Sequence, residues 1–139
     1  MHITMLGTGY VGLVSGACFS EFGFQVCCVD KNQSKIDNLK NNIMPIYEPG
    51  LESLVIKNKE AGRLTFSNNI DKEIQKADII FIAVGTPTRR GDGHADLTYV
   101  YEAAEKIAKN LNGYTVIVTK STVPVGTGIE VKKIIKQIN

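Results

Sequence analysis

Short apolar runs separated by amphipathic segments repeat along the whole chain. Runs rich in apolar residues predict five short strands, at residues 3–6, 25–29, 64–66, 78–84 and 115–119. The segments between them carry apolar residues at helical spacing. Strands that alternate with helices in this way are typical of a parallel, doubly wound α/β sheet.

The first two predicted helices differ in pattern. Residues 10–22 are apolar on nearly every face, so we expect a buried helix that Gly23 ends. Asn32 is expected to cap a second helix, whose apolar stripe comprises Ile36, Leu39 and Ile43.

Proline, glycine and aspartate mark the limits of the later helices. Pro49 suits the first position of a third helix, which Gly62 ends, and a short helix follows near residues 71–76. Asp96 is a good N-cap for the next helix. That helix presents an apolar face of Val100, Ala103, Ala104, Ile107 and Leu111. The last helix presents Val131, Ile134, Ile135 and Ile138.

The number of strands bears on domain organisation. At 139 residues the chain has the length of one domain. The complete dinucleotide-binding fold has six strands in the order 3-2-1-4-5-6, whereas this pattern predicts five and no strand after the last helix. We therefore expect residues 1–139 to form a three-layer α/β/α Rossmann domain that is truncated before its sixth strand.

The first strand leads into the glycine motif Gly7-Thr-Gly-Tyr-Val-Gly12, and Asp30 follows the second strand. In a dinucleotide-binding βαβ unit, Gly7 would allow the tight turn, Gly9 would let the backbone approach a pyrophosphate, and Gly12 would let the helix lie close to the sheet. The helix N-terminus presents free N–H groups to the phosphates. A glycine turn that serves packing alone is the alternative.

Asp30 also bears on cofactor choice. A carboxylate at the tip of the second strand accepts hydrogen bonds from the adenosine ribose hydroxyls and repels a 2′-phosphate. The sequence therefore favours NAD over NADP, although Lys31, the next residue, would weaken that repulsion.

Two further positions lie at the carboxyl edge of the predicted sheet, where open α/β sheets bind ligands. Lys35, in the first turn of the second helix, would face the ribose or remain a solvated lysine. Thr86 follows the strand at 78–84 and would offer its hydroxyl to the cofactor or belong to an ordinary turn. The arginines at 89 and 90 and His94 are interpreted as surface residues of an exposed loop.

Composition and charge exclude several classes of function. The chain has 43% hydrophobic residues, 22% charged residues and a net charge of +2, which is typical of a soluble globular protein and argues against a nucleic-acid or anionic-membrane partner. No apolar run approaches the ~20 residues of a transmembrane helix, and the N-terminus lacks the pattern of a signal peptide. We expect a cytoplasmic protein.

The three cysteines, Cys18, Cys27 and Cys28, lack the spacing of metal ligands, so no metal site is expected. Cys27 and Cys28 are neighbours on a strand and should face opposite sides of the sheet. All three are interpreted as small buried residues in a reducing compartment, because no base is placed beside them.

Five motifs together resemble the UDP-glucose/GDP-mannose dehydrogenase family. They occur in family order over essentially the whole chain: Gly7-Thr-Gly-Tyr-Val-Gly12, Pro45-Ile-Tyr-Glu-Pro-Gly-Leu51, Val84-Gly-Thr-Pro87, Asp92-Gly-His-Ala-Asp-Leu97 and Lys120-Ser-Thr-Val-Pro124. Tyr47 and the Asp-Gly-x-Ala-Asp-Leu form favour the UDP-glucose branch. The GDP-mannose and UDP-N-acetylmannosamine branches are the alternatives.

The resemblance implies a function and a set of site residues. The family oxidises carbon 6 of a sugar nucleotide to a carboxylate with two NAD molecules, through a cysteine-bound intermediate. Thr122 resembles the family threonine that helps to hold a water or oxyanion, an accessory catalytic role. The cofactor-binding residues that we expect are Gly7, Gly9, Tyr10, Val11, Gly12, Asp30, Lys35, Thr86 and Thr122.

The family pattern also indicates what these residues lack. The family's catalytic cysteine belongs to a later segment in a sugar-nucleotide domain, and none of the three cysteines here matches it. The strand with the family's Asn-Pro-Glu-Phe motif and the central helix that builds the family's dimer are also missing. We expect an inactive N-terminal part of an enzyme whose full-length form is a homodimer.

Two rival interpretations remain. One is a self-contained, non-catalytic NAD-binding module, against which the last predicted strand argues, because it would be left as an uncovered edge. The other is a dehydrogenase of the 3-hydroxyacyl or 6-phosphogluconate type, which shares the glycine motif but does not explain the Pro-Ile-Tyr-Glu-Pro-Gly and Lys-Ser-Thr-Val-Pro stretches.

Overall fold

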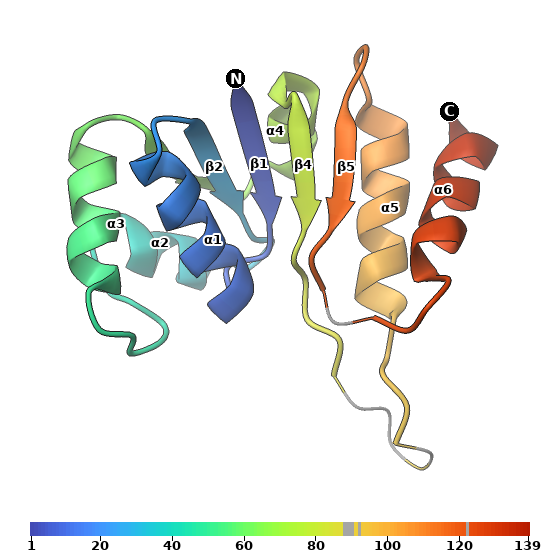
Figure 1. Ribbon diagram of the computed structural model, residues 1–139, viewed down its shortest axis with the longest axis horizontal. Coiled ribbons are helices and arrows are strands. Elements are labelled where there is room, and N and C mark those ends of the chain that lie inside the picture. Colours follow the sequence, from blue (N-terminus) through green and yellow to red (C-terminus); the bar gives the residue numbers. More distant parts are fainter. Residues whose placement is uncertain (88–90, 92, 122) are drawn as a thin grey trace.

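A parallel sheet forms the centre of the protein, as the apolar pattern predicts. The computed structural model describes residues 1–87, 91, 93–121 and 123–139. In these residues five parallel strands pair in the order β3-β2-β1-β4-β5 (Figure 1). The strands are β1 (His2–Leu6), β2 (Gln25–Val29), β3 (Leu64–Ser67), β4 (Ile79–Ile82) and β5 (Val116–Thr119).

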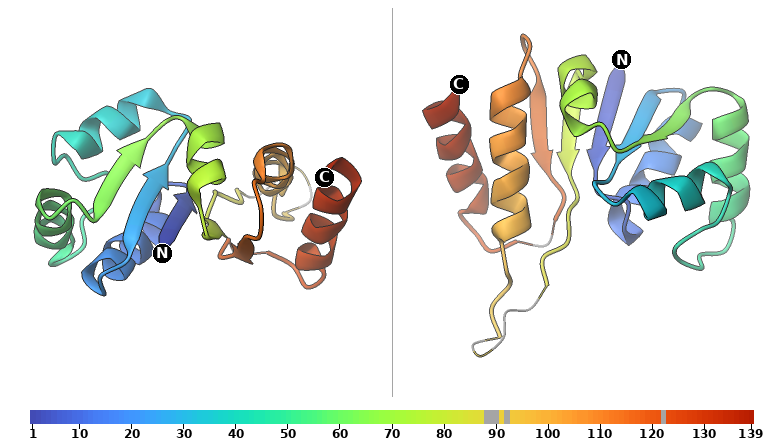
Figure 2. Two further views of the ribbon diagram at one scale, coloured as in Figure 1. Left: turned by 90° about the horizontal axis from the view of Figure 1, so that it is seen from above. Right: turned by 180° about the vertical axis from the view of Figure 1, so that it is seen from behind.

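Helices cover both faces of this sheet, which confirms the three-layer doubly wound fold. They are α1 (Tyr10–Glu21), α2 (Gln33–Lys40), α3 (Leu51–Glu60), α4 (Ile70–Lys76), α5 (Thr98–Asn110) and α6 (Thr127–Ile138). Helices α1 and α3 pack together on one side, whereas α4, α5 and α6 pack on the other (Figure 2). None of the helices among the described residues is long and apolar enough to cross a bilayer.

Two apolar clusters fill the space between the layers. Successive strand residues point to opposite faces, and Cys27 and Cys28 follow this rule: Cys28 packs in the cluster under α1 and α3, and Cys27 packs in the cluster under α4 and α5. The prediction that these two cysteines are buried on opposite sides of the sheet is confirmed.

The expected complete burial of the first helix is wrong. Only one stripe of α1 faces the sheet, and it comprises Gly12, Leu13, Gly16, Ala17 and Ser20. Cys18 lies on the other side of the helix and is exposed, as are Tyr10 and Val11 near its N-terminus. Apolar residues around the whole circumference cannot all reach one sheet face, so the sequence pattern overestimated the burial of this helix.

Two predicted helix limits, at Pro49 and Ile43, are shifted by the local backbone conformation. Pro49 is not the first residue of α3 but the second residue of a turn, in which the Leu51 N–H donates to the Glu48 carbonyl at 3.0 Å and Gly50 takes a φ of +81°. Ile43 lies beyond α2 and is exposed, because Asn42 takes a left-handed conformation that ends the helix.

A third shift occurs at Asp96, which lies one residue before the N-cap of α5 and not at the N-cap itself. Leu97 is the N-cap of α5, and the Asp96 carboxylate accepts hydrogen bonds from the Thr98 N–H at 2.9 Å and the Thr98 hydroxyl at 2.6 Å. The side chain therefore still holds an amide of the first turn.

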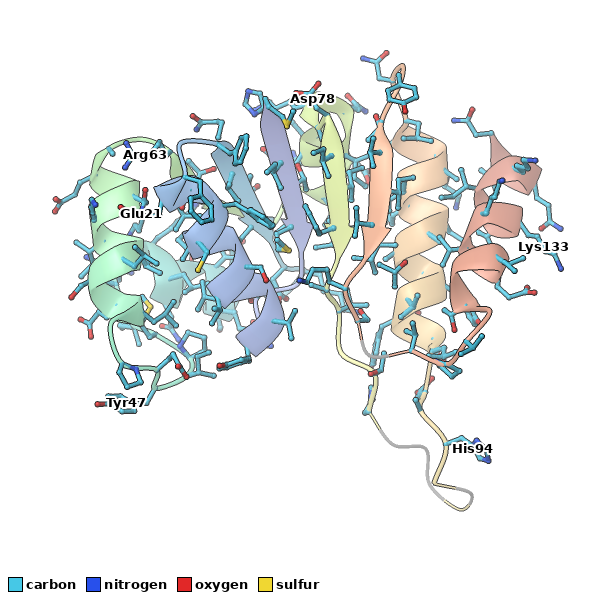
Figure 3. The ribbon with its side chains drawn as sticks, in the orientation of Figure 1. Glu21, Tyr47, Arg63, Asp78, His94 and Lys133 are labelled. Carbon is cyan, nitrogen blue, oxygen red and sulfur yellow. The ribbon has the colours of Figure 1, made fainter. Side chains whose placement is uncertain are left out.

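A polar network around the buried Asn58 ties α1 and α3 to the start of β3. The Asn58 side chain is fully buried; its amide nitrogen donates to the Glu21 carboxylate at 3.0 Å, and its oxygen accepts from the Arg63 guanidinium at 2.9 and 3.0 Å. Arg63 also donates to the Ser20 carbonyl at 3.0 Å, and Lys57 pairs with Glu21. Figure 3 places Glu21 and Arg63 on the side of the molecule formed by α1 and α3.

Candidate cofactor site

The glycine turn between β1 and α1 is held by two very close backbone approaches. Gly7 has a φ of +113°, and a Cβ atom there would lie 2.4 Å from the Ala83 carbonyl oxygen at the end of β4. A Cβ atom at Gly12 would lie 2.1 Å from the Gly7 carbonyl oxygen. Neither position accepts a side chain, so Gly7 shapes the turn and Gly12 brings the helix against it, as predicted.

Gly9 differs from these two glycines. A Cβ atom at Gly9 would meet no other atom within 4 Å, and Gly9 itself lines a cleft. The missing side chain therefore leaves open space in the cleft, and no neighbouring part of the chain fills it. This observation favours close approach of a bound group and argues against a turn that serves packing alone.

The N-terminus of α1 opens into the same cleft. Gly9 is its N-cap and has no side chain to cap the helix, and no acidic residue lies in the first turn. The first N–H groups and the positive end of the helix dipole remain suited to an anion such as a pyrophosphate. Tyr10 and Val11, both predicted site residues, line the cleft at this point.

The Asp30 carboxylate is held at the tip of β2 by two neutral donors. Thr8, which is buried, donates its hydroxyl to Asp30 Oδ2 at 2.8 Å, and the Asn32 N–H donates to Oδ1 at 3.0 Å. Both bonds orient the carboxylate, and Asp30 stays partly exposed. Thr8 was not among the predicted site residues; its position between the first two glycines is its only signal in the sequence.

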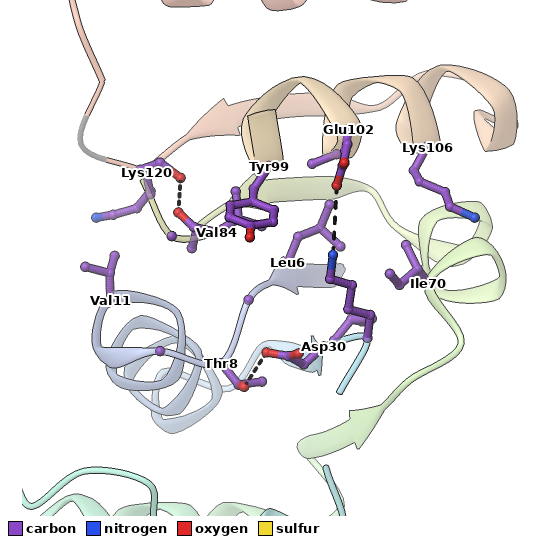
Figure 4. Close-up of a pocket in the computed structure, with 18 of the residues that line it drawn as sticks. Leu6, Thr8, Val11, Asp30, Ile70, Val84, Tyr99, Glu102, Lys106 and Lys120 are labelled. Atoms are coloured by element: carbon purple, nitrogen blue, oxygen red, sulfur yellow. Dashed lines mark hydrogen bonds and ion pairs between the residues drawn. The ribbon is translucent and has the colours of Figure 1, made fainter. Parts of the chain in front are cut away.

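The cleft has a volume of about 790 Å³ and lies at the carboxyl ends of the neighbouring strands β1 and β4, the point at which strand order reverses (Figure 4). Ligands bind at this switch point in open α/β sheets. The structure brings most of the predicted cofactor residues to its lining: Gly7, Gly9, Tyr10, Val11, Asp30, Lys35 and Thr86. Gly12 lies beneath the turn, and Thr122 lies outside the described residues, as do Arg89 and Arg90.

Helix α5 forms the opposite wall of the cleft, and none of its residues was among the predicted site residues. Tyr99, Glu102 and Lys106 of this helix line the cleft. The Lys31 ammonium lies 3.9 Å from Glu102 Oε2 and 5.1 Å from the centre of the Tyr99 ring. Such contacts depend on how α5 packs beside β4, and no local motif signals them.

The segment after β5 contributes the floor of the cleft next to Thr86. Lys120 and Ser121 line the cleft, and the Ser121 hydroxyl donates to the Val84 carbonyl at 2.8 Å. This bond fixes the backbone just before Gly85 and Thr86. The Lys120-Ser-Thr-Val-Pro motif was the sequence signal for it.

The remaining predicted surface and cysteine residues lie apart from this cleft. His94 is exposed on the loop that extends beyond the carboxyl edge of the sheet (Figure 3). Burial raises the pKa of the Cys27 thiol to about 12 and raises that of Cys28 further. Neither cysteine nor histidine occurs among the described residues that line the cleft.

Comparisons with known proteins agree with this geometry. The family model described as "UDP-glucose/GDP-mannose dehydrogenase family, NAD binding domain" matches residues 1–139. A UDP-glucose 6-dehydrogenase of Rhizobium meliloti (strain 1021) is 60% identical over 139 residues, which is 100% of this chain and 32% of that relative.

Two solved structures have the same fold over almost the whole chain. A UDP-glucose dehydrogenase from Pyrobaculum islandicum has a TM-score of 0.92 and 36% identity, and a GDP-mannose dehydrogenase from Pseudomonas aeruginosa has a TM-score of 0.93 and 34% identity. Each match covers 99% of this chain and 32% of the solved chain. The chain thus spans about a third of the length of the proteins that it matches.

Proposed function

The chain belongs to the UDP-glucose/GDP-mannose dehydrogenase family as its NAD-binding domain, and on that premise we propose that it binds NAD in the cleft between α1 and α5. The observation that carries the proposal is the open space at Gly9, which lies between the uncapped N-terminus of α1 and the oriented Asp30 carboxylate. These features match the two polar parts of the cofactor's adenosine half.

Named residues would hold each part of the cofactor. The backbone of Gly9, Tyr10 and Val11 would receive the pyrophosphate, and Asp30 would accept hydrogen bonds from the adenosine ribose, with Lys35 beside it. Thr86, two residues after the Val84 carbonyl that Ser121 holds, would contact the nicotinamide half. Gly7 and Gly12 contribute by shaping the turn, and Thr122 is retained as a cofactor and accessory catalytic residue from the family resemblance alone. When bound, NAD supplies a hydride acceptor.

We propose further that the full-length protein oxidises UDP-glucose to UDP-glucuronate with two NAD, as a cytoplasmic homodimer. The 60% identical relative is named UDP-glucose 6-dehydrogenase, and Tyr47 and the motif at residues 92–97 favour the same branch. The test is NADH production by the full-length enzyme from UDP-glucose, GDP-mannose and UDP-N-acetylmannosamine. A higher kcat/KM with either alternative substrate would overturn the assignment of the branch.

Calorimetric titration of the 139-residue chain with NAD and NADP tests the binding proposal. We expect NAD to bind and NADP to bind at least about tenfold more weakly, a difference of about 1.4 kcal/mol, because the 2′-phosphate meets Asp30. We expect no NADH from UDP-glucose, since the cleft lining offers no thiol among the described residues. Absence of NAD binding at millimolar ligand would contradict the proposal.

A further inference from the structure

Lys31 lies where a cation would help to bind a 2′-phosphate. It is the first residue after Asp30, at the tip of β2, and it lines the cleft. In dinucleotide-binding folds a basic residue near this point accommodates the 2′-phosphate of NADP. A lysine free to reach that point would offset the repulsion that Asp30 exerts.

In the structure, the Lys31 ammonium group contacts α5, which forms the opposite wall of the cleft. Its ammonium group pairs with Glu102 at 3.9 Å, an interaction drawn as a dashed line in Figure 4, and lies over the Tyr99 ring. The ion pairs of the described residues include none between Lys31 and Asp30. The two hydrogen bonds that the structure gives to Asp30 come instead from the uncharged Thr8 hydroxyl and Asn32 N–H.

We propose that Glu102 is a positioning residue for cofactor selectivity. It holds the Lys31 ammonium group against α5, away from the 2′-hydroxyl of the adenosine ribose, and so strengthens the exclusion of NADP. The inference rests on the proposed cofactor site and adds to it a determinant outside the glycine motif. Tyr99 supports the same lysine position through a cation–π contact at 5.1 Å.

The effect is expected to be modest because the pair is solvated. The Lys31 and Glu102 side chains are 70% and 57% exposed, and exposed ion pairs change an equilibrium by roughly two- to fivefold. We therefore expect Glu102→Gln to lower the ratio of the NADP to the NAD dissociation constant by about two- to fivefold, mainly through tighter NADP binding.

Glu105→Gln is the matched control. Glu105 lies on the same helix, lines the same cleft and carries the same charge, but the ion pairs of the described part of the chain do not join it to Lys31. Loss of a negative charge in itself acts in both variants, whereas release of Lys31 acts only in Glu102→Gln. The double variant Lys31→Met/Glu102→Gln removes the released lysine.

The experiment is calorimetric titration of the wild-type chain and these variants with NAD and with NADP. The expected result is a lower ratio in Glu102→Gln than in Glu105→Gln, and return to the wild-type ratio in the double variant. Equal ratios in the two single variants, or a gain that persists without Lys31, would overturn the inference. If the wild-type chain binds neither dinucleotide, the proposed cofactor site fails and the inference falls with it, a result distinct from binding with unchanged selectivity.

Discussion

The Asp30 carboxylate has one oxygen bonded to the Thr8 hydroxyl and the other to the Asn32 N–H, so it is oriented before any ligand arrives. Asp30→Ala should weaken NAD binding about 10- to 100-fold, because a hydrogen bond to a charged group contributes about 1.5–3 kcal/mol. The same change should reduce the preference for NAD over NADP. Calorimetry measures both effects, and Asp37→Ala, on the exposed part of α2, is the control for loss of charge.

Alanine substitutions at Gly9 and Gly12 should have different effects, the first on NAD binding and the second on stability. At Gly9 a methyl group meets no neighbouring atom, so Gly9→Ala should leave the melting temperature nearly unchanged while weakening NAD binding by about tenfold or more. At Gly12 the same methyl group would lie 2.1 Å from the Gly7 carbonyl oxygen. Gly12→Ala should therefore cost about 1–3 kcal/mol of stability and lower the melting temperature by roughly 3–10 °C. Thermal unfolding that ranks the two variants in the opposite order would contradict this account.

The cysteines should differ in reactivity. Cys18 is exposed, whereas burial raises the pKa of Cys27 from 9.0 to about 12 and also raises that of Cys28. A thiol reagent at pH 8 should modify Cys18 rapidly and the other two only after unfolding. Rapid modification of a second thiol in the native chain would show that the strand cysteines are accessible.

The two buried thiols should also make stability depend on pH. The folded state retains the thiol protons of Cys27 and Cys28, whereas the unfolded state releases them near pH 9. Stability should therefore fall as the pH rises from about 9 towards 12.

At the residue scale, spacing predicted much of the site because the backbone geometry itself requires glycine at Gly7 and Gly12. It did not identify Thr8 or Gly16. A Cβ atom at Gly16 would lie 2.6 Å from Cys28 Sγ, a contact that depends on how the helix packs on β2. Pattern alone carries no information on such distances between elements.

At the scale of elements, the Asn58 network should be a main source of cohesion between α1, α3 and β3. Asn58→Leu keeps the number of side-chain heavy atoms but removes the hydrogen bonds that join Asn58 to Arg63 and Glu21, so it should cost about 2–3 kcal/mol. Chemical denaturation measures the loss, and NAD binding should be unchanged because the network lies outside the cleft. Asn68→Ala, at an exposed position, should change stability by less than about 0.5 kcal/mol. Equal effects of the two changes would show that the network contributes little.

The order and type of the elements could be predicted from sequence, since apolar runs and helical spacing are local signals. The residues at which the helices begin were harder to predict. Pro49 belongs to a turn before α3, and Asp96 holds the first turn of α5 from one residue outside the N-cap. In both cases the residue plays a recognised local role, but its exact position depends on hydrogen bonds to neighbours that the pattern does not specify.

At the scale of the whole molecule, the site arises where strand order reverses between β1 and β4. The glycine turn, Asp30 and Thr86 could be assigned to one edge of the sheet from sequence, because parallel strands share a carboxyl edge. The wall formed by α5, with Tyr99 and Glu102, could not, since it depends on the crossover that places this helix beside the cleft. That wall supplies the two contacts of the Lys31 ammonium group, with Glu102 and with the Tyr99 ring.

The most direct test of the central claim is to locate NAD on the chain by titrating the 15N-labelled protein and following its backbone amide signals. The largest shifts should fall at Gly9, Tyr10 and Val11 and at Asp30 and Thr86, while the amides of α3 stay nearly unchanged. Saturation with that pattern would place the cofactor across the glycine turn and the tip of β2. No shifts at millimolar NAD, or shifts centred on α3 or α6, would contradict the account.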